Sequence, residues 1–245
     1  VTLSATRTEI AICVAPSLYV YDGASLTQVT DPDLPAVTSI TYLAQRFIVS
    51  DDGDRVYWTD LLDGESIDGL NFQTAESHPD KLVRVYSDGE SFYALGTVST
   101  DLFGSVTNPT SASNAFARLG SGVLKSGLIG VHAVAEDTDS KLLGFIGHNR
   151  IIYATQGYQL QPISTPFIER LLAKADLKDL QNARCFAYSE AGEIFFVVSI
   201  PNVGTYAYGK KLGKWHRRQT LGQVNWRADQ YVYAFGQDYV ASTND

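Results

Sequence analysis

Short runs of Val, Ile, Tyr and Phe, separated by Gly, Pro, Asp and Asn, recur along the chain. β-branched and aromatic residues favour strands, and the residues between the runs favour tight turns. The pattern therefore predicts strand pairs joined by short turns. There are six such pairs: 9–15 with 18–22, 46–50 with 55–59, 91–96 with 98–103, 141–147 with 150–155, 193–200 with 205–208, and 230–236 with 239–242.

The strand pairs also repeat. Their first strands begin at positions 9, 46, 91, 141, 193 and 230, an average interval of about 44 residues. Further apolar runs at 38–43, 81–86, 131–135, 183–188 and 224–228 precede five of them, and 158–164 offers a fourth strand to the fourth repeat. This interval matches the four-stranded blade of a β-propeller, whereas a plain sandwich predicts no such repeat. We predict an all-β fold, a β-propeller of about six blade-like repeats in one domain over 1–245.

Two segments interrupt this pattern. At the start of 165–175, Thr165 suits an N-cap and Pro166 a first helical position, while the apolar residues fall on one helical face. We expect an inserted helix near 165–180, which either packs on the propeller or docks a partner. Residues 106–126 are rich in Ser, Thr, Asn and Gly, and predict a long loop.

Composition sets limits on function. The chain has 245 residues, 44% of them hydrophobic, so it can bury a core without a disulfide or metal. It carries 27 acidic and 19 basic side chains, a net charge of −8, which argues against general nucleic-acid binding. We expect no membrane span, and two buried thiols at Cys13 and Cys185 in a reducing compartment. The absence of methionine suggests that the chain is part of a longer protein.

Candidate chemistry is sparse. The acidic segments 51–54 and 136–139 could each offer oxygens to calcium, but neither has the twelve-residue loop with a closing Glu. Glu76, His78 and Asp80 lie close together in sequence near Pro79, which indicates a solvated loop. No nucleophile elbow, phosphate-binding loop or histidine pair at metal spacing is present. We therefore predict no enzyme activity, no catalytic residue, no cofactor and no metal.

One basic cluster surrounds an aromatic residue near the C-terminal end. The cations could blunt an exposed edge strand, meet an acidic protein partner, or contact nucleic acid with the aromatic ring stacked on a base. The candidate partner-binding residues are Lys210, Lys211, Lys214, Trp215, Arg217 and Arg218.

Several stretches resemble one protein family. They are VYWTDL at 56–61, NFQTAES at 71–77 with PD at 79–80, RIIY at 150–153 with GYQ at 157–159 and QPIST at 161–165, GKWH at 213–216, and YVYAFG at 231–236. In this order they resemble the packaged-DNA stabilisation protein of P22-like short-tailed phages, also called the tail hub or head-completion protein.

The resemblance implies a non-enzymatic structural protein of the virion tail or neck, assembled in the host cytoplasm. It further implies a propeller in a hexameric ring that joins the portal and its adaptor to the tail needle and tailspikes and closes the DNA exit channel. With a net charge of −8, we expect it to retain DNA by closing that channel rather than by tight direct binding. The alternative is a tail propeller that binds or hydrolyses a glycan.

Overall fold

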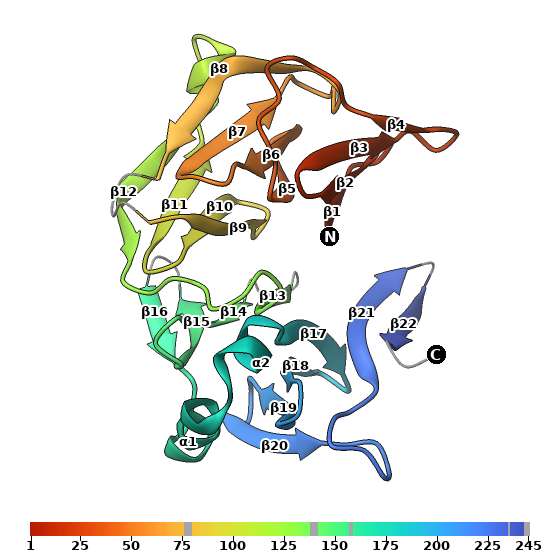
Figure 1. Cartoon of the computed structure of the whole chain (residues 1–245), viewed down its shortest axis with the longest axis vertical. Helices are drawn as coiled ribbons and strands as arrows, with labels where there is room; N and C mark the ends of the chain where they lie inside the picture. The colour runs from red at the N-terminus through yellow and green to blue at the C-terminus, as the bar shows by residue number, and fades with distance from the viewer. Residues whose placement is uncertain (76–79, 138–141, 157–158, 235, 243–245) are drawn as a thin grey trace. The chain divides into compact units, whose positions relative to one another are not determined.

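The computed structural model describes residues 1–75, 80–137, 142–156, 159–234 and 236–242. Strands within these ranges form six antiparallel sheets, five with four strands and one with two (Figure 1). Contacts divide the chain into two units, Val1–Gly127 and Leu128–Asp245, and each is described by itself. A single domain over 1–245 stays a prediction. Glu76 and His78 of the candidate loop, and 138–139 of the second calcium candidate, lie outside the described residues.

The first unit holds three sheets, in each of which strands pair with their neighbours in the chain. A short 3-10 helix, η1 (Ala112–Asn114), precedes the last strand. The strands are β1 (Thr2–Ala5), β2 (Ile10–Val14), β3 (Ser17–Tyr21) and β4 (Leu26–Gln28); β5 (Ser39–Leu43), β6 (Arg46–Ser50), β7 (Arg55–Thr59) and β8 (Ile67–Thr74); and β9 (Leu82–Ser87), β10 (Ser91–Gly96), β11 (Thr100–Ser105) and β12 (Phe116–Leu124).

The second unit continues the same sheet topology and adds two helices. Its last sheet contains only two strands among the described residues. The elements are β13 (Val134–Asp137), β14 (Leu142–Ile146), β15 (Ile152–Gln156) and β16 (Gln159–Pro162); α1 (Pro166–Lys174) and α2 (Leu177–Gln181); β17 (Arg184–Glu190), β18 (Glu193–Ile200), β19 (Gly204–Gly209) and β20 (Lys214–Arg218); and β21 (Ala228–Ala234) and β22 (Gln237–Ser242).

The predicted strand pairs are confirmed, and four of the strands, β6, β7, β10 and β18, have the predicted bounds. Two other predictions are wrong. The predicted loop at 106–126 contains β12, whose Phe116 is buried against neighbouring aromatic rings. Residues 224–227 precede the sixth sheet rather than forming a strand in it, so β21 is the first strand of that sheet.

The inserted helix is confirmed as α1, followed by the short α2. Thr165 has the extended backbone of an N-cap, although its side chain makes no capping hydrogen bond. Ile168 and Leu172, on the apolar face of α1, are buried. The described helices are all too short or too polar to cross a membrane.

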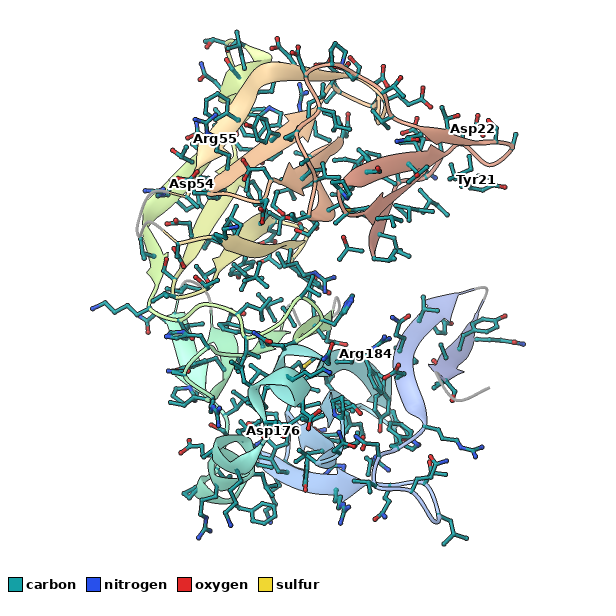
Figure 2. All side chains as sticks on the ribbon, in the orientation of Figure 1. Tyr21, Asp22, Asp54, Arg55, Asp176 and Arg184 are labelled. Carbon is teal, nitrogen blue, oxygen red and sulfur yellow. The ribbon has the colours of Figure 1, made fainter. Side chains whose placement is uncertain are left out.

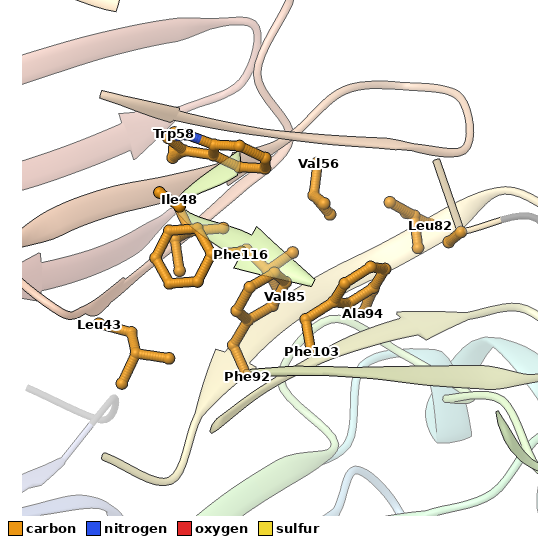
Figure 3. Close-up of a cluster of buried hydrophobic side chains, with 12 residues drawn as sticks. Leu43, Ile48, Val56, Trp58, Leu82, Val85, Phe92, Ala94, Phe103 and Phe116 are labelled. Atoms are coloured by element: carbon orange, nitrogen blue, oxygen red, sulfur yellow. The ribbon is translucent and has the colours of Figure 1, made fainter. Parts of the chain in front are cut away.

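A closed aromatic core holds two sheets of the first unit together (Figure 3). Phe92 stacks on Phe103 with ring centroids 5.0 Å apart, and its ring also meets the Phe116 ring edge-on at 5.4 Å. Trp58 packs edge-on against Phe116 at 5.2 Å, and its indole N–H donates to the carbonyl oxygen of Ala112 at 2.9 Å. All of these aromatic side chains are buried, so this sheet contact is a complete core.

A related cluster in the second unit is less complete. Where β17–β20 meets β21, Phe186 is buried, whereas Tyr188, Phe195, Trp226 and Tyr231 are only partly buried. The cluster therefore combines a small core with aromatic surface that water can reach. The partly exposed aromatic cluster lies in the same unit as the predicted basic cluster.

Candidate partner-binding site

The predicted basic cluster lies on the turn and strand at one edge of a sheet. β20 pairs with β19 on one side and is the last strand in the order β17-β18-β19-β20. Lys214 and Arg217 are exposed on it, and Lys210 and Lys211 are exposed in the preceding turn. Exposed charges of this kind blunt an edge strand against unwanted pairing. Whether they also bind a partner stays a prediction.

The other two members of the basic cluster, Trp215 and Arg218, make contacts with other residues of the second unit. Trp215 donates its indole N–H to the carbonyl oxygen of Ile163 at 2.6 Å, and its ring lies 5.4 Å from that of Tyr208. Arg218 donates to the Tyr188 hydroxyl at 2.9 Å and lies over the Phe195 ring. The structure thus separates the predicted residues into four exposed cations and two side chains that anchor the strand.

His216 lies between the two anchors on β20 and is partly buried. Its ring meets the Phe195 ring at right angles, with centroids 5.4 Å apart. Burial lowers the pKa of His216, and the nearby positive charge of Arg218 lowers it further, while Glu193 opposes the shift. The neutral imidazole is therefore the form that suits this packing.

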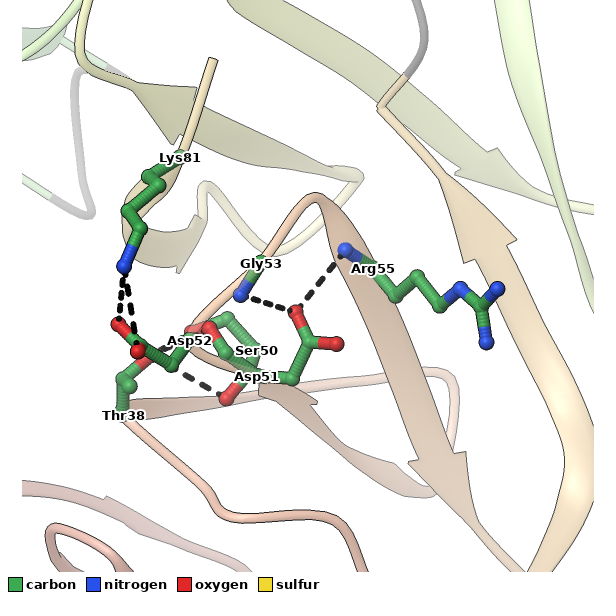
Figure 4. Close-up of polar contacts among 7 residues, drawn as sticks. All are labelled: Thr38, Ser50, Asp51, Asp52, Gly53, Arg55 and Lys81. Atoms are coloured by element: carbon green, nitrogen blue, oxygen red, sulfur yellow. Dashed lines mark hydrogen bonds and ion pairs between the residues drawn. The ribbon is translucent and has the colours of Figure 1, made fainter. Parts of the chain in front are cut away.

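The first calcium candidate is a turn stabilised by its own carboxylates (Figure 4). One Asp51 carboxylate oxygen accepts from the backbone N–H of Gly53 at 2.9 Å and from that of Arg55 at 3.0 Å. Asp52 pairs with Lys81 at 3.2 Å. Among the described residues, no three His, Cys, Asp or Glu side chains come together as a metal site.

The β3–β4 hairpin uses a carboxylate in the same structural way (Figure 2). Asp22 accepts from the backbone N–H groups of Ser25 at 2.7 Å and Ala24 at 2.8 Å. These bonds, the one from Ser25 first, lower the pKa of Asp22. The Tyr21 hydroxyl donates to the carbonyl oxygen of Gly23 at 2.8 Å. Both acidic turns are accounted for by local folding.

A crevice of about 340 Å³ opens beside the partly buried aromatic cluster of the second unit. Single-sequence reasoning missed it, although the aromatic residues at 226, 231 and 233 were a signal that could have drawn attention to this segment. Its walls combine aromatic rings, one guanidinium and two carboxylates. The lining residues are Phe186, Tyr188, Ser189, Glu190, Arg218, Trp226, Tyr231, Asp238 and Val240.

Two polar contacts shape the wall that β21 and β22 contribute. The Tyr231 hydroxyl donates to an Asp238 carboxylate oxygen at 2.7 Å, and this bond raises the pKa of Tyr231 to about 12. Arg184 on β17, labelled in Figure 2, forms an ion pair with Asp229 on β21 at 3.1 Å. The second contact links the two sheets on either side of the crevice.

A second hollow, of about 560 Å³, adjoins the crevice and is more acidic. Glu136 and Asp137, the described part of the second calcium candidate, line it together with Asp238. Tyr231 and Tyr233 contribute aromatic surface. An acidic, aromatic hollow of this kind suits a cationic group, but the described residues form no metal cluster there.

The cysteines lie on strands, as their neighbours in the sequence predict. Cys13 on β2 is buried, as predicted, whereas Cys185 on β17 is only partly buried, so the prediction of a buried thiol is wrong for Cys185. Neither cysteine forms a disulfide. Burial raises the pKa of the Cys13 thiol, which makes it a poor nucleophile.

Among the solved structures that resemble this chain is a WD40 domain, which is a β-propeller. The WD40 domain of Toxoplasma gondii coronin matches with a TM-score of 0.60 and 9% identity, over 100% of this chain and 65% of that one. A chain of the mitotic checkpoint complex matches with a TM-score of 0.58 and 11% identity, over 87% of this chain and 63% of that one. At these identities the likeness shows the fold alone. The chain spans just under two thirds of each.

No curated protein matches the sequence. A family model does: the one described as "Bacteriophage P22 Gp10, beta-propeller", a phage stabilisation family, matches residues 1–245. The match covers the whole sequence, and the repeated four-stranded sheets are those of a propeller. The chain therefore belongs to the bacteriophage P22 Gp10 family of β-propeller proteins.

Proposed function

We propose that this chain acts in the neck of a short-tailed phage as a non-enzymatic hub. It joins the portal and its adaptor to the distal tail parts and closes the DNA exit channel. The observation that carries the proposal is the match of the P22 Gp10 family over residues 1–245. The hexameric ring and the individual partners belong to the proposal as well.

The distribution of charge supports retention of DNA by a closed channel. Residues 1–127 carry 16 acidic and 7 basic side chains, a net charge of −9, whereas residues 128–245 carry 11 and 12, a net charge of +1. Tight binding to duplex DNA requires many phosphates to be neutralised by Lys and Arg. The first unit is unsuited to that role, and the second has one cluster of exposed cations at 210–217.

The proposal is tested by assembly. We expect the purified protein to form a closed ring in electron microscopy and light scattering, and to pellet with portal–adaptor complexes. Filter binding to duplex DNA at physiological salt should show no tight complex. Hydrolysis of a host polysaccharide, or saturable binding to one, would instead favour the glycan-directed alternative.

The role of the basic cluster needs a separate variant. We expect Lys210→Glu/Lys211→Glu/Lys214→Glu to weaken pelleting with the portal–adaptor complex by about tenfold or more, because like charges would then face an acidic partner. The matched control is Arg7→Glu/Arg55→Glu/Lys125→Glu, which changes the net charge equally at three exposed positions outside the cluster and outside the inserted helix. Equal effects of both triple variants would remove the cluster from the proposal.

A further inference from the structure

The two helices of the second unit present a surface of apolar and basic side chains, which we call the helical stripe. Ile168 and Leu172 are buried on the inner side of α1. Phe167 on α1 and Leu177 on α2 are instead more than half exposed. The exposed cations of the helical stripe are Arg170, Lys174 and Lys178.

The positive charge of the helical stripe is only partly compensated. Two carboxylates of this segment are half-buried and occupied: Glu169 accepts from the Ser164 hydroxyl at 2.9 Å, and Asp179 accepts from an Asn202 amide at 3.1 Å. The one exposed carboxylate between 165 and 182 is Asp176 (Figure 2). Among the residues that the structure describes, none of the three cations forms an ion pair.

The loop between β7 and β8 in the first unit has the opposite character. Leu61 and Leu62 are more than half exposed, and so is Leu70 at the far end of residues 60–70, which we call the acidic loop. The sequence from 56 to 80 contains no Lys or Arg. The exposed carboxylates on the acidic loop or beside it are Asp33, Asp63, Glu65 and Asp68. Both surfaces therefore combine large apolar side chains with charge of a single sign.

Backbone hydrogen bonds hold the acidic loop in one conformation. The backbone N–H of Asp60 donates to the carbonyl oxygen of Ser66 at 2.9 Å, and that of Leu62 donates to the carbonyl oxygen of Gln45 at 2.9 Å. Leu62 has a φ of 59°, in the left-handed region that bulky side chains rarely adopt. Its apolar side chain is thus held out in water. A surface fixed in advance loses little conformational entropy on binding.

The carboxylates around the acidic loop repel one another. Burial raises the pKa of Glu9, which lies against Gly64, and the negative charge of Asp63 raises it further. The backbone N–H of Gly64 opposes the shift, while Glu65 adds to it. An approaching cation relieves this kind of repulsion. The acidic loop therefore favours a basic surface as its partner.

Neither surface can pair with its own copy. A twofold contact sets a surface against the identical surface of the second molecule, which here would bring like charges together. A contact between the acidic loop of one copy and the helical stripe of another brings opposite charges together. Such a contact is heterologous, and heterologous contacts build closed rings or open filaments.

We propose that the acidic loop of one copy of this chain docks on the helical stripe of the next copy. The leucines of the loop contact Phe167 and Leu177, and the carboxylates of the loop meet the three cations of the stripe. The inference deepens the proposed function, because it rests on the proposed ring and names the surfaces through which the copies meet.

Charge reversal in the full 245-residue chain tests this contact. Two triple variants are compared with the wild type by light scattering and sedimentation velocity. Each should raise the apparent dissociation constant of assembly about tenfold or more, because like charges then face each other. The variants are Arg170→Glu/Lys174→Glu/Lys178→Glu in the helical stripe and Asp33→Lys/Glu65→Lys/Asp68→Lys at the acidic loop.

Mixing the two variants gives the sharpest result. In an equimolar mixture each reversed surface meets a reversed partner and each native surface a native one. Assembly should therefore recover to within about threefold of the wild type. The matched control, at exposed positions outside both surfaces, should assemble as the wild type does. It is Arg55→Glu/Lys125→Glu/Arg227→Glu.

Leu62→Gly separates docking from folding. Glycine adopts a positive φ without strain, so the midpoint of urea unfolding of the first unit should stay nearly unchanged. Assembly should weaken by about fivefold, because the exposed apolar side chain is lost. An equal loss of stability and of assembly would give Leu62 a structural role only and would contradict its part in the contact.

Three results would overturn the inference: a wild-type chain that stays monomeric, either triple variant assembling as the wild type does, or a mixture that assembles no better than its components. Pelleting with portal–adaptor complexes is measured on the same preparations. Rings that form and pellet regardless of both triple variants contradict this inference alone. Rings that depend on both surfaces and do not pellet contradict the proposed function alone.

Discussion

Two aromatic clusters in this protein lie at the same kind of sheet contact and differ in how well they are covered. Between β5–β8 and β9–β12, the rings of Trp58, Phe92 and Phe116 are buried (Figure 3). Between β17–β20 and β21–β22, Tyr188 and Trp226 remain partly exposed beside a crevice. The residue types are similar, and the number of covering strands differs. Among the described strands, two four-stranded sheets bury the first cluster fully, whereas a four-stranded and a two-stranded sheet leave the second partly exposed.

The largest effect should come from the closed cluster. Phe92→Ala removes a ring that packs against both Phe103 and Phe116. All three rings are buried from water. We expect the free energy of unfolding of the first unit to fall by about 3–5 kcal/mol. Urea unfolding can be followed by the fluorescence of Trp58, the tryptophan of this unit.

The control for Phe92→Ala is Phe167→Ala on α1. Phe167 is 55% exposed and lies at 6.4 Å from the Tyr206 ring. Its removal should cost about 0.5 kcal/mol or less. If the two substitutions had equal effects on their own units, the distinction between buried and exposed aromatic residues would have no energetic meaning here.

The open cluster should respond less to the same kind of change. Trp226 packs at 6.0 Å from Phe186 and 6.2 Å from Tyr188, but its ring is only partly buried. We expect Trp226→Ala to cost about 2 kcal/mol, below the range for a fully buried ring. Hydrogen exchange of β18 amides would measure it. A cost as large as that of Phe92→Ala would show that the crevice side is as well packed as the core.

Most of the fold could be predicted because its signals are local. Hairpins such as β6–β7 combine apolar runs with a turn whose Asp and Gly residues bond within the turn itself. α1 begins at Pro166 as its residues indicate. These features depend on neighbours in the chain, and the sequence displays them directly.

The outer strands of the sheets are harder to predict from the sequence, because their exposed faces weaken the alternation of apolar and polar residues. The composition of 106–126 predicts a loop in place of β12, because small and polar residues surround its one large buried ring, Phe116. β8 contains Gly69 and pairs irregularly with β7. β4 has three residues, all exposed. Such strands are defined by the partner they pair with, which a single sequence does not show.

The candidate site likewise has one part that the sequence predicts and another that it does not show. The sequence located the cations of 210–217, because charge clusters are visible in a single chain. It could not show that Arg218 turns toward Tyr188 and Trp226, which lie 30 and 8 positions away. Sequence reasoning misses the crevice because four separate strands, β17, β20, β21 and β22, build it together with Trp226 in the segment before β21.

The next prediction concerns the hydrogen bond on the wall of the crevice. The Tyr231 phenol donates to Asp238, which raises its pKa to about 12 in the folded protein from an ordinary value near 10. The stabilising effect is therefore fully present below pH 10 and is lost as the pH rises from 10 to 12. Ultraviolet absorbance of the phenolate would follow Tyr231, with Tyr231→Phe as the reference.

Asp238→Leu tests the cause of that shift. Without the acceptor and its charge, the pKa of Tyr231 should return toward 10, and the loss of stability between pH 10 and 12 should shrink. Because Tyr231 lies at the rim of the cluster, solvent screening keeps the energetic effect below that of the ring deletions. An unchanged titration in Asp238→Leu would assign the shift to burial instead.

The smallest effect should come from His216, whose ring packs against Phe195 of the same cluster. Its pKa is lowered from an ordinary 6.5 by burial against Phe195 and by the charge of Arg218, with Glu193 opposing. As the pH falls below about 6.5, the unfolded chain takes up the proton first, so the second unit loses stability until the folded-state pKa is reached. NMR titration of the imidazole would locate that pKa. His216→Gln should remove this loss of stability near pH 6.5, and a His216 pKa at or above 6.5 would contradict the lowering by burial and by the charge of Arg218.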